Sequence, residues 1–158
     1  MYFAHVLTNR SHSLYLPQEA REDIARLVSA HQRTKASREM APFRRQVDFW
    51  LLCLGVALAD DLQPREGAPA SWGYKFVDTR EVQLPSEIYN LLAIIAFEQM
   101  EHDADRIDDP SRIIDAANSL AGAACSHVLA AVTSKELRHS PLDKALTVAR
   151  GALNRATG

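Results

Sequence analysis

The acidic stretch around His102 holds the side chains best suited to metal chemistry. Glu98 and His102 are four residues apart, so on a helix both would face one side and could ligate a divalent metal. The di-iron bundle pattern instead needs a glutamate three residues before a histidine, repeated on other helices. Gln99 occupies that position and no second copy occurs. The charged members are Glu98, Glu101, Asp103, Asp105, Asp108 and Asp109, against Arg106. We expect a polar helix end or docking surface; a metal-dependent enzyme is the alternative.

A basic segment, residues 33–45, is the second candidate site. Its five cationic side chains face Glu39 alone and are Arg33, Lys35, Arg38, Arg44 and Arg45. Guanidinium groups bind phosphates and carboxylates well, so the segment predicts a surface for nucleic acid or for an acidic protein face. The alternative is a solvated connection whose arginines pair with the acidic stretch.

Neither the cysteines nor the histidines form a catalytic arrangement along the chain. Cys53 and Cys125 lie far apart in apolar helical patterns, which indicates buried thiols in a reducing cytosol. The six histidines are scattered, and no phosphate-binding loop or nucleophile elbow occurs. We therefore expect no catalytic residue, no metal and no cofactor. A cysteine and a histidine that meet only in the fold are the nucleophilic alternative.

Two aromatic residues lie in a glycine- and proline-rich connection, residues 62–73, or directly after it. Trp72 and Tyr74 have two interpretations, since aromatic side chains dominate both cores and the anchors of protein interfaces. One interpretation is core packing, and the other is a partner-facing anchor.

Apolar residues recur at spacings of three and four in five segments, which predicts five helices. They cover roughly residues 17–32, 42–60, a segment from Pro85 that frays near His102, 111–133 and 141–156. Residues 13–16 and 74–78 fit short strands. The fold class is therefore mainly α, a compact bundle of about five helices with at most a small two-stranded β element. The segment 42–60 is apolar all round, which predicts the centre of the domain or of an oligomer interface. Gly55 within it predicts a closely approaching helix.

Length and composition indicate one globular domain of 158 residues. An N-terminal strand–helix–helix unit (about 10–60) is followed by the loop 62–73 and C-terminal helices (about 85–156). With 20 acidic and 18 basic residues, the chain has no overall positive charge that would attract nucleic acid, so any such contact must come from a local basic patch. The N-terminus does not resemble a signal peptide, and the longest apolar run, residues 49–59, is shorter than the ~18 residues of a membrane span. We expect a cytoplasmic protein with no membrane contact.

Two segments together resemble a known family. Pro42-Phe43-Arg44 opens an apolar, glycine-containing helix through Leu58, and a short strand and a second apolar helix, residues 87–96, follow. This order resembles small accessory proteins of bacterial DNA phosphorothioation (sulfur-modification) and related phage-defence loci, over about residues 40–100. The resemblance implies an accessory or partner-binding role in prokaryotic defence.

The N-terminal half also resembles the ribbon–helix–helix order of dimeric DNA-binding proteins. There the outward strand residues, here Ser13 and Tyr15 with Arg10 or His12, would read the major groove. The stretch between the helices, about 33–41, is longer than the usual short turn of that fold.

The expected function is a non-enzymatic accessory subunit of a prokaryotic anti-phage defence or DNA-processing complex. Its partners would be other protein subunits, with DNA and a second copy of the chain as further partners. A ribbon–helix–helix-like regulator and a protein–protein adaptor without DNA contact are the alternatives.

Overall fold

The computed structural model describes residues 11–29, 34–82, 84, 86–99, 109–135 and 139–157. In chain order its elements are β1 (Ser13–Pro17), the 3-10 helix η1 (Gln18–Ala20), α2 (Arg21–Leu27), α3 (Lys35–Met40), α4 (Gln46–Ala59), α5 (Pro69–Trp72), β2 (Gly73–Asp78), α6 (Ser86–Gln99), α7 (Pro110–Val132) and α8 (Pro141–Thr157). The fold is mainly α with a small two-stranded sheet, as the sequence predicts.

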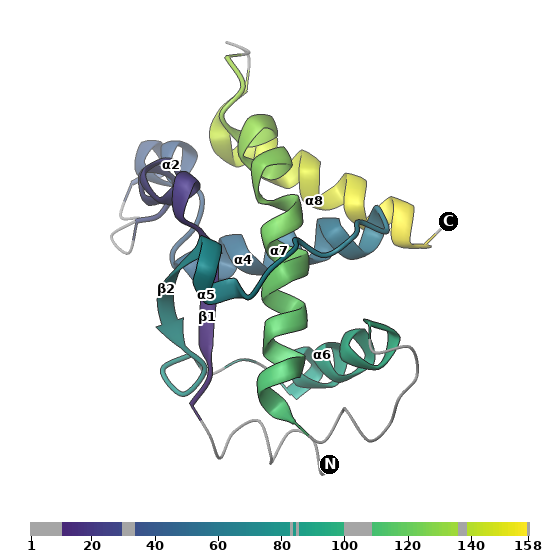
Figure 1. Ribbon diagram of the computed structural model, residues 1–158. Coiled ribbons are helices and arrows are strands. Elements are labelled where there is room, and N and C mark those ends of the chain that lie inside the picture. The colour runs from purple at the N-terminus through teal and green to yellow at the C-terminus, as the bar shows by residue number, and fades with distance from the viewer. Residues whose placement is uncertain are drawn as a thin grey trace.

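Helix α7 is the centre of the fold (Figure 1). It begins where Pro110 occupies the first turn and the Asp109 side chain accepts a hydrogen bond from the Ser111 amide at 3.0 Å. Alanines and Gly122 give it a slim profile, so neighbouring elements approach it from several sides. Helices α4, α6 and α8 and strand β1 all pack against it.

Helix α7 is also long and apolar enough to be compared with a membrane-spanning helix. The longest uninterrupted apolar run, residues 49–59, lies in another helix and does not reveal this. By length and composition alone α7 is sufficient to cross a membrane, with a mean hydropathy of 1.2 over its best window. Within the fold, 61% of that window is buried against other elements, and the core helix of a globular protein passes the same criterion.

The two predicted strands pair with each other, antiparallel, across 55 intervening residues of chain. Leu16 lies opposite Tyr74 and Leu14 opposite Val77, with an irregularity in register after Leu14. Leu14 and Leu16 are completely buried, so the alternation of β1 directs its leucines into the core.

The other edge of β1 is occupied by a side chain of α7. The Asn118 Oδ1 atom accepts hydrogen bonds from the Tyr15 amide at 3.0 Å and from the Trp50 indole at 3.2 Å. Its Nδ2 atom donates to the Ser13 carbonyl at 3.1 Å. Asn118 and Trp50 are both completely buried. One amide side chain thus substitutes for a neighbouring strand and connects β1, α4 and α7.

The first helix is shorter than the periodicity over 17–32 predicts. Pro17 belongs to β1, and the helical turns run only from η1 to Leu27. Val28 instead forms a parallel bridge to Phe43, with the Ser29 amide donating to the Phe43 carbonyl at 2.9 Å. A contact 15 residues away in the chain therefore ends the helix, and local spacing does not reveal it.

Three other boundaries need correction. The predicted connection 33–45 contains helix α3, and the following helix begins at Gln46 rather than at Pro42. The predicted loop 62–73 ends in the short helix α5. Both unpredicted helices are short, six and four residues, and neither shows an apolar repeat long enough to detect.

The prediction for Gly55 is wrong. A Cβ atom built there would meet nothing within 4 Å, so no helix approaches closely. Helix α4 is buried on the side of Phe49, Trp50 and Cys53, whereas Gly55 and Leu58 are exposed. The close approach occurs at Gly122 instead, where a Cβ would lie 2.7 Å from the Trp72 ring.

Candidate partner-binding surface

The basic segment is held against the core by Phe43. Its amide donates to the Leu27 carbonyl at 3.1 Å, and its ring meets Phe49 edge-on with centroids 5.3 Å apart. Phe43 is buried, whereas the next two residues, Arg44 and Arg45, are exposed. The sequence Phe-Arg-Arg therefore anchors the turn and presents two guanidinium groups at the start of α4.

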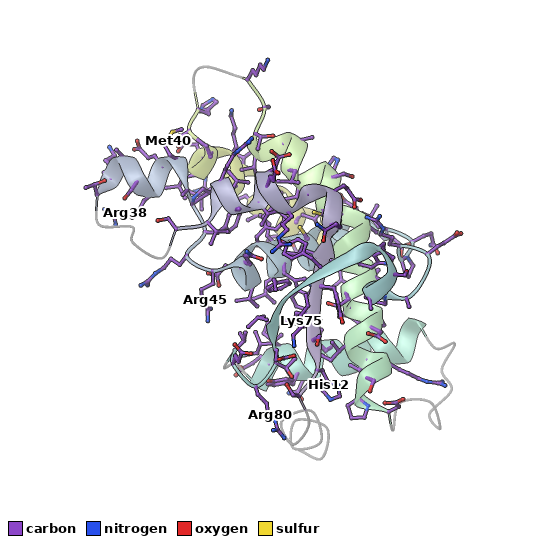
Figure 2. All side chains as sticks on the ribbon, turned by 60° about the vertical axis from the view of Figure 1, so that its left-hand side comes forward. His12, Arg38, Met40, Arg45, Lys75 and Arg80 are labelled. Carbon is purple, nitrogen blue, oxygen red and sulfur yellow. The ribbon has the colours of Figure 1, made fainter. Side chains whose placement is uncertain are left out.

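Helix α3 carries the other described cations. It begins at a capping box in which the Thr34 side chain accepts from the Ser37 amide at 3.0 Å and Ser37 accepts from the Thr34 amide at 3.1 Å. Arg38 is exposed, and Met40 at the end of the helix is 65% exposed. Figure 2 shows Arg38, Met40 and Arg45 on the same flank of the molecule. We call Lys35, Arg38, Arg44 and Arg45, with Met40 among them, the basic surface.

Two of the four cations on the basic surface are already ion-paired. Lys35 lies 3.7 Å from Glu39, and the Arg45 guanidinium lies 2.9 Å from the Asp48 carboxylate, which also caps the Arg45 amide at 3.0 Å. Among the described residues, Arg38 and Arg44 have no ion-pair partner. The surface therefore offers two guanidinium groups that have no ion-pair partner among the described residues, beside an exposed methionine.

The charge of the basic surface extends to the start of α8. Hydrogen bonds from the Ser140 hydroxyl and amide lower the pKa of Asp143, and the nearby charges of His139 and Lys35 lower it further. Helix α3 packs against α8, which brings Lys35 within reach of that carboxylate. The basic surface is thus bordered on one side by an acid.

A cavity of about 300 Å³ lies beside Arg45. Its lining includes Arg45, Gln46, Phe76 and Glu81. The Tyr74 hydroxyl donates to the Gln46 side chain at 3.1 Å close to this cavity. The cavity is small and mostly apolar, with one cation and one acid at its rim.

Tyr74 is buried and is not available as a partner-facing anchor, whereas Trp72 is partly exposed. Tyr74 is buried in the core, and burial raises the pKa of its hydroxyl to about 12. The Trp72 ring packs over Gly122, its indole N–H donates to the Gly67 carbonyl at 3.2 Å, and the Arg65 guanidinium lies 4.7 Å from its ring centroid. The Tyr74 ring therefore belongs to the core, and the Trp72 ring packs on Gly122 while part of it remains exposed. An anchor role for Trp72 stays a prediction.

The cysteines are buried free thiols, as predicted. Burial, followed by the neighbouring Cys125 thiol, raises the pKa of Cys53 well above its usual value. Because the thiolate is the reactive form, Cys53 lacks the properties of a catalytic nucleophile.

Several predicted site residues lie outside the described residues. They are Arg10 of the base-reading candidates, Arg33 of the basic segment, and Glu101, His102, Asp103, Asp105 and Asp108 of the acidic stretch; the side chain of Glu98 is likewise not described. Within the described part of the chain, no three His, Cys, Asp or Glu side chains come together in a group that could hold a metal ion.

Two residues important to this geometry escape sequence reasoning. Asn118 lies among other polar residues of α7, such as Asp115 and Ser119, and Met40 lies beside apolar residues of the basic segment, such as Ala41 and Phe43. Composition therefore singles out neither residue, and only their positions in the fold reveal their roles.

Comparisons with known proteins add no relative: no protein-family model matches the chain, and no curated protein or solved structure does.

Proposed function

We propose that this chain is a non-enzymatic accessory subunit whose basic surface docks on an acidic face of a partner protein. The observation that carries the proposal is the exposed set of Arg38, Met40 and Arg44, next to Phe43, which is buried and bonded to Leu27. Arginine and methionine are enriched in protein interfaces relative to the rest of the surface. The resemblance of residues 40–100 suggests that the partner belongs to a prokaryotic defence or DNA-processing complex.

The charges favour a protein partner over nucleic acid. A nucleic-acid surface gains affinity by releasing counterions at many phosphates, roughly one for each cation that contacts the backbone. Two guanidinium groups without a partner among the described residues supply little of that affinity. The carboxylates of Glu39 and Asp48 lie beside the other two cations and would repel a phosphate backbone. An acidic protein face with an apolar pocket for Met40 matches this pattern better.

The ribbon–helix–helix alternative is disfavoured by the position of β1. The ribbon of such dimers is built from one strand of each protomer, so it needs a free strand edge. Here β2 pairs with one edge and Asn118 with the other. The Ser13 hydroxyl, one of the proposed base-reading groups, donates to the Asp78 carboxylate at 3.0 Å.

The test is a quantitative pull-down of tagged protein from its native host at low and at moderate salt. The double variant Arg38→Glu/Arg44→Glu should reduce capture of a stoichiometric protein partner by about tenfold or more, because charge reversal introduces repulsion as well as removing attraction. Met40→Lys should weaken capture independently.

Arg112→Glu is the matched control. Arg112 is exposed in the first turn of α7, at the other end of the fold from α3, where the helix dipole favours an acid. It should capture the partner as wild type does. Unchanged capture by the correctly folded double variant would contradict the proposal. DNA without protein in the eluate, lost as salt rises, would favour nucleic-acid binding instead.

A further inference from the structure

A second surface lies between α4 and α8 and adjoins the basic surface at Asp143, near the start of α8. Its far end is closed by an ion pair in which the Arg155 guanidinium binds the Asp60 carboxylate, with Nη2 3.2 Å from Oδ2. Between the two helices runs an apolar groove of about 570 Å³. Gly55 and Leu58 contribute to one wall, and Ala149, Leu153 and Ala156 to the other.

This groove is bordered by unusually exposed leucines. Leu153 is 63% exposed, Leu146 47% and Leu58 38%. Gly55 faces open space, although glycine at an exposed helix position costs about 1 kcal/mol relative to alanine. Clustered apolar side chains of this kind mark interaction surfaces.

The outer face of α8 has the spacing of a helix-pairing seam. Leu142, Leu146, Ala149, Leu153 and Ala156 follow one another at intervals of four, three, four and three residues. This is the heptad repeat with which one helix packs along another. Ala149, Leu153 and Ala156 belong both to the helix-pairing seam and to the wall of the groove. A twofold contact uses the same surface on both copies, so this surface must supply both the protruding side chains and the groove that receives them.

We propose that this surface binds a second copy of the chain, with the two α8 helices antiparallel across a twofold axis. Leu142 of one copy then faces Leu153 of the other, and Leu146 faces Ala149. This arrangement also opposes the two helix dipoles favourably.

Charge selects this register over the neighbouring one. Asp143 and Arg150 each follow a seam residue directly, so they lie on the same flank of α8. In the proposed register Asp143 of each copy lies beside Arg150 of the other, which gives two identical ion pairs. Shifting the helices by one heptad would bring the two Arg150 side chains together. Arg150 has no ion-pair partner among the described residues of its own chain.

The hollow at Gly55 fits the same register. The ion pair between Asp60 and Arg155 places these two residues side by side, at the same height along α4 and α8. Gly55 on α4 and Arg150 on α8 each lie five residues earlier. At a rise of about 1.5 Å per residue, Gly55 and Arg150 share the next level. In the proposed register the helical turn that contains Leu146 of the second copy lies opposite Arg150. Leu146 of the second copy would therefore lie over Gly55, which is beside Arg150.

The size of the surface predicts a weak dimer. The seam from Leu142 to Ala156 is about 21 Å long, and α4 lies beside α8 at a helix-packing distance of roughly 8–10 Å. The surface therefore covers roughly 400 Å² per copy and about 800 Å² in total, below the ~1,200–2,000 Å² of stable complexes. We therefore expect weak association, with a dissociation constant on the order of 100 µM.

Sedimentation velocity on the full chain, from about 2 to about 500 µM, tests the proposal. Wild type should pass from monomer to dimer across this range. Leu153→Lys should raise the dissociation constant by about tenfold or more, and since Leu153 is largely exposed the fold should survive, as circular dichroism can verify. Ile94→Lys on α6 is the matched control, 61% exposed and outside the surface, and should dimerise as wild type does.

The register has its own test. Arg150→Asp should weaken dimerisation about three- to tenfold at low salt by opposing Asp143 of the second copy, and the difference should vanish near 1 M NaCl. A monomer at all concentrations, a Leu153→Lys protein that dimerises normally, or an Arg150→Asp protein that is unaffected at low salt would each overturn the proposal.

This inference does not rest on the proposed function, and the variants separate the two. Arg38→Glu/Arg44→Glu should dimerise normally, because neither residue lies on the α4–α8 surface. Leu153→Lys should still capture the protein partner through the basic surface.

Discussion

The junction at Asn118 and the basic surface differ in how many of their polar groups have partners within the fold. At the junction one buried amide makes three hydrogen bonds, to Tyr15, Ser13 and Trp50. On the basic surface two of four cations have no ion-pair partner among the described residues, and Met40 is exposed beside them. Saturated polar groups fix a fold, whereas unsaturated charges beside exposed apolar atoms are available to another molecule. Substitutions in the two regions should therefore differ in what they damage.

Replacing Asn118 should have the largest effect on stability. Asn118→Leu leaves the Tyr15 amide, the Ser13 carbonyl and the Trp50 indole without their partner in the interior, at a cost of about 3–5 kcal/mol. Urea denaturation followed by tryptophan fluorescence measures the loss. Asn154→Ala, on the exposed side of α8, is the control and should change stability by less than about 0.5 kcal/mol. A loss below about 1 kcal/mol for Asn118→Leu would mean that the amide does not hold β1.

Two glycines should respond with opposite signs. Gly122→Ala places a Cβ 2.7 Å from the Trp72 ring, so the ring must shift, and we expect a loss of about 1–3 kcal/mol. Gly55→Ala meets nothing, so improved helix propensity should stabilise the monomer by up to about 1 kcal/mol. Both are measured at about 1 µM protein, where the proposed dimer is dissociated. Equal effects would contradict the assignment of α7, not α4, as the closely packed helix.

Tyr74 gives a pH test of its burial. Burial, followed by the nearby Cys125, raises its pKa to about 12 while Arg21 opposes the shift. The unfolded chain has the ordinary value of about 10, so stability is unaffected below pH 10, falls as the pH rises towards 12, and then levels. Phenolate absorbance should show late-titrating tyrosines, since burial also raises the pKa of Tyr89, and Tyr74→Phe should remove one of them. At neutral pH this variant should cost about 1 kcal/mol or less, through the lost bond to Gln46. A Tyr74 that titrates near 10 would restore it as a surface anchor.

The smallest effect separates two adjacent arginines. Arg45→Ala removes the pair with Asp48 at the start of α4 and should cost about 0.5 kcal/mol, a fall in Tm of roughly 1–2 °C. Arg44→Ala removes no pair with a described residue and should leave Tm unchanged within error. Thermal melts in low and high salt test this, because only the Arg45 effect should be screened. The reverse order would exchange the roles assigned to the two side chains.

Sequence pattern was sufficient for the long elements. The stripes over 111–133 and 141–156 correspond to α7 and α8 within a residue or two, and the strands at 13–16 and 74–78 are present. These segments are long or strongly alternating, so local periodicity reports their burial directly.

Pattern failed where a distant contact decides the structure. Val28 leaves its helix to pair with Phe43, and α3 depends on a capping box rather than on apolar spacing. The candidate site was predicted as composition only. Which of its arginines are free depends on Glu39 and Asp48, and side-chain geometry determines those pairs.

The double attachment of β1 has a consequence for the order of assembly during synthesis. Its partners on β2 follow it by 56 to 65 residues and Asn118 follows Tyr15 by 103. At roughly 5–20 residues per second, the ribosome needs about 5–20 s after it has synthesised Tyr15 before it synthesises Asn118. Until then the leucines of this strand have no core to enter. The first strand of the chain is thus among the last elements to be secured, and premature termination before α7 should leave a product that cannot bury its own beginning.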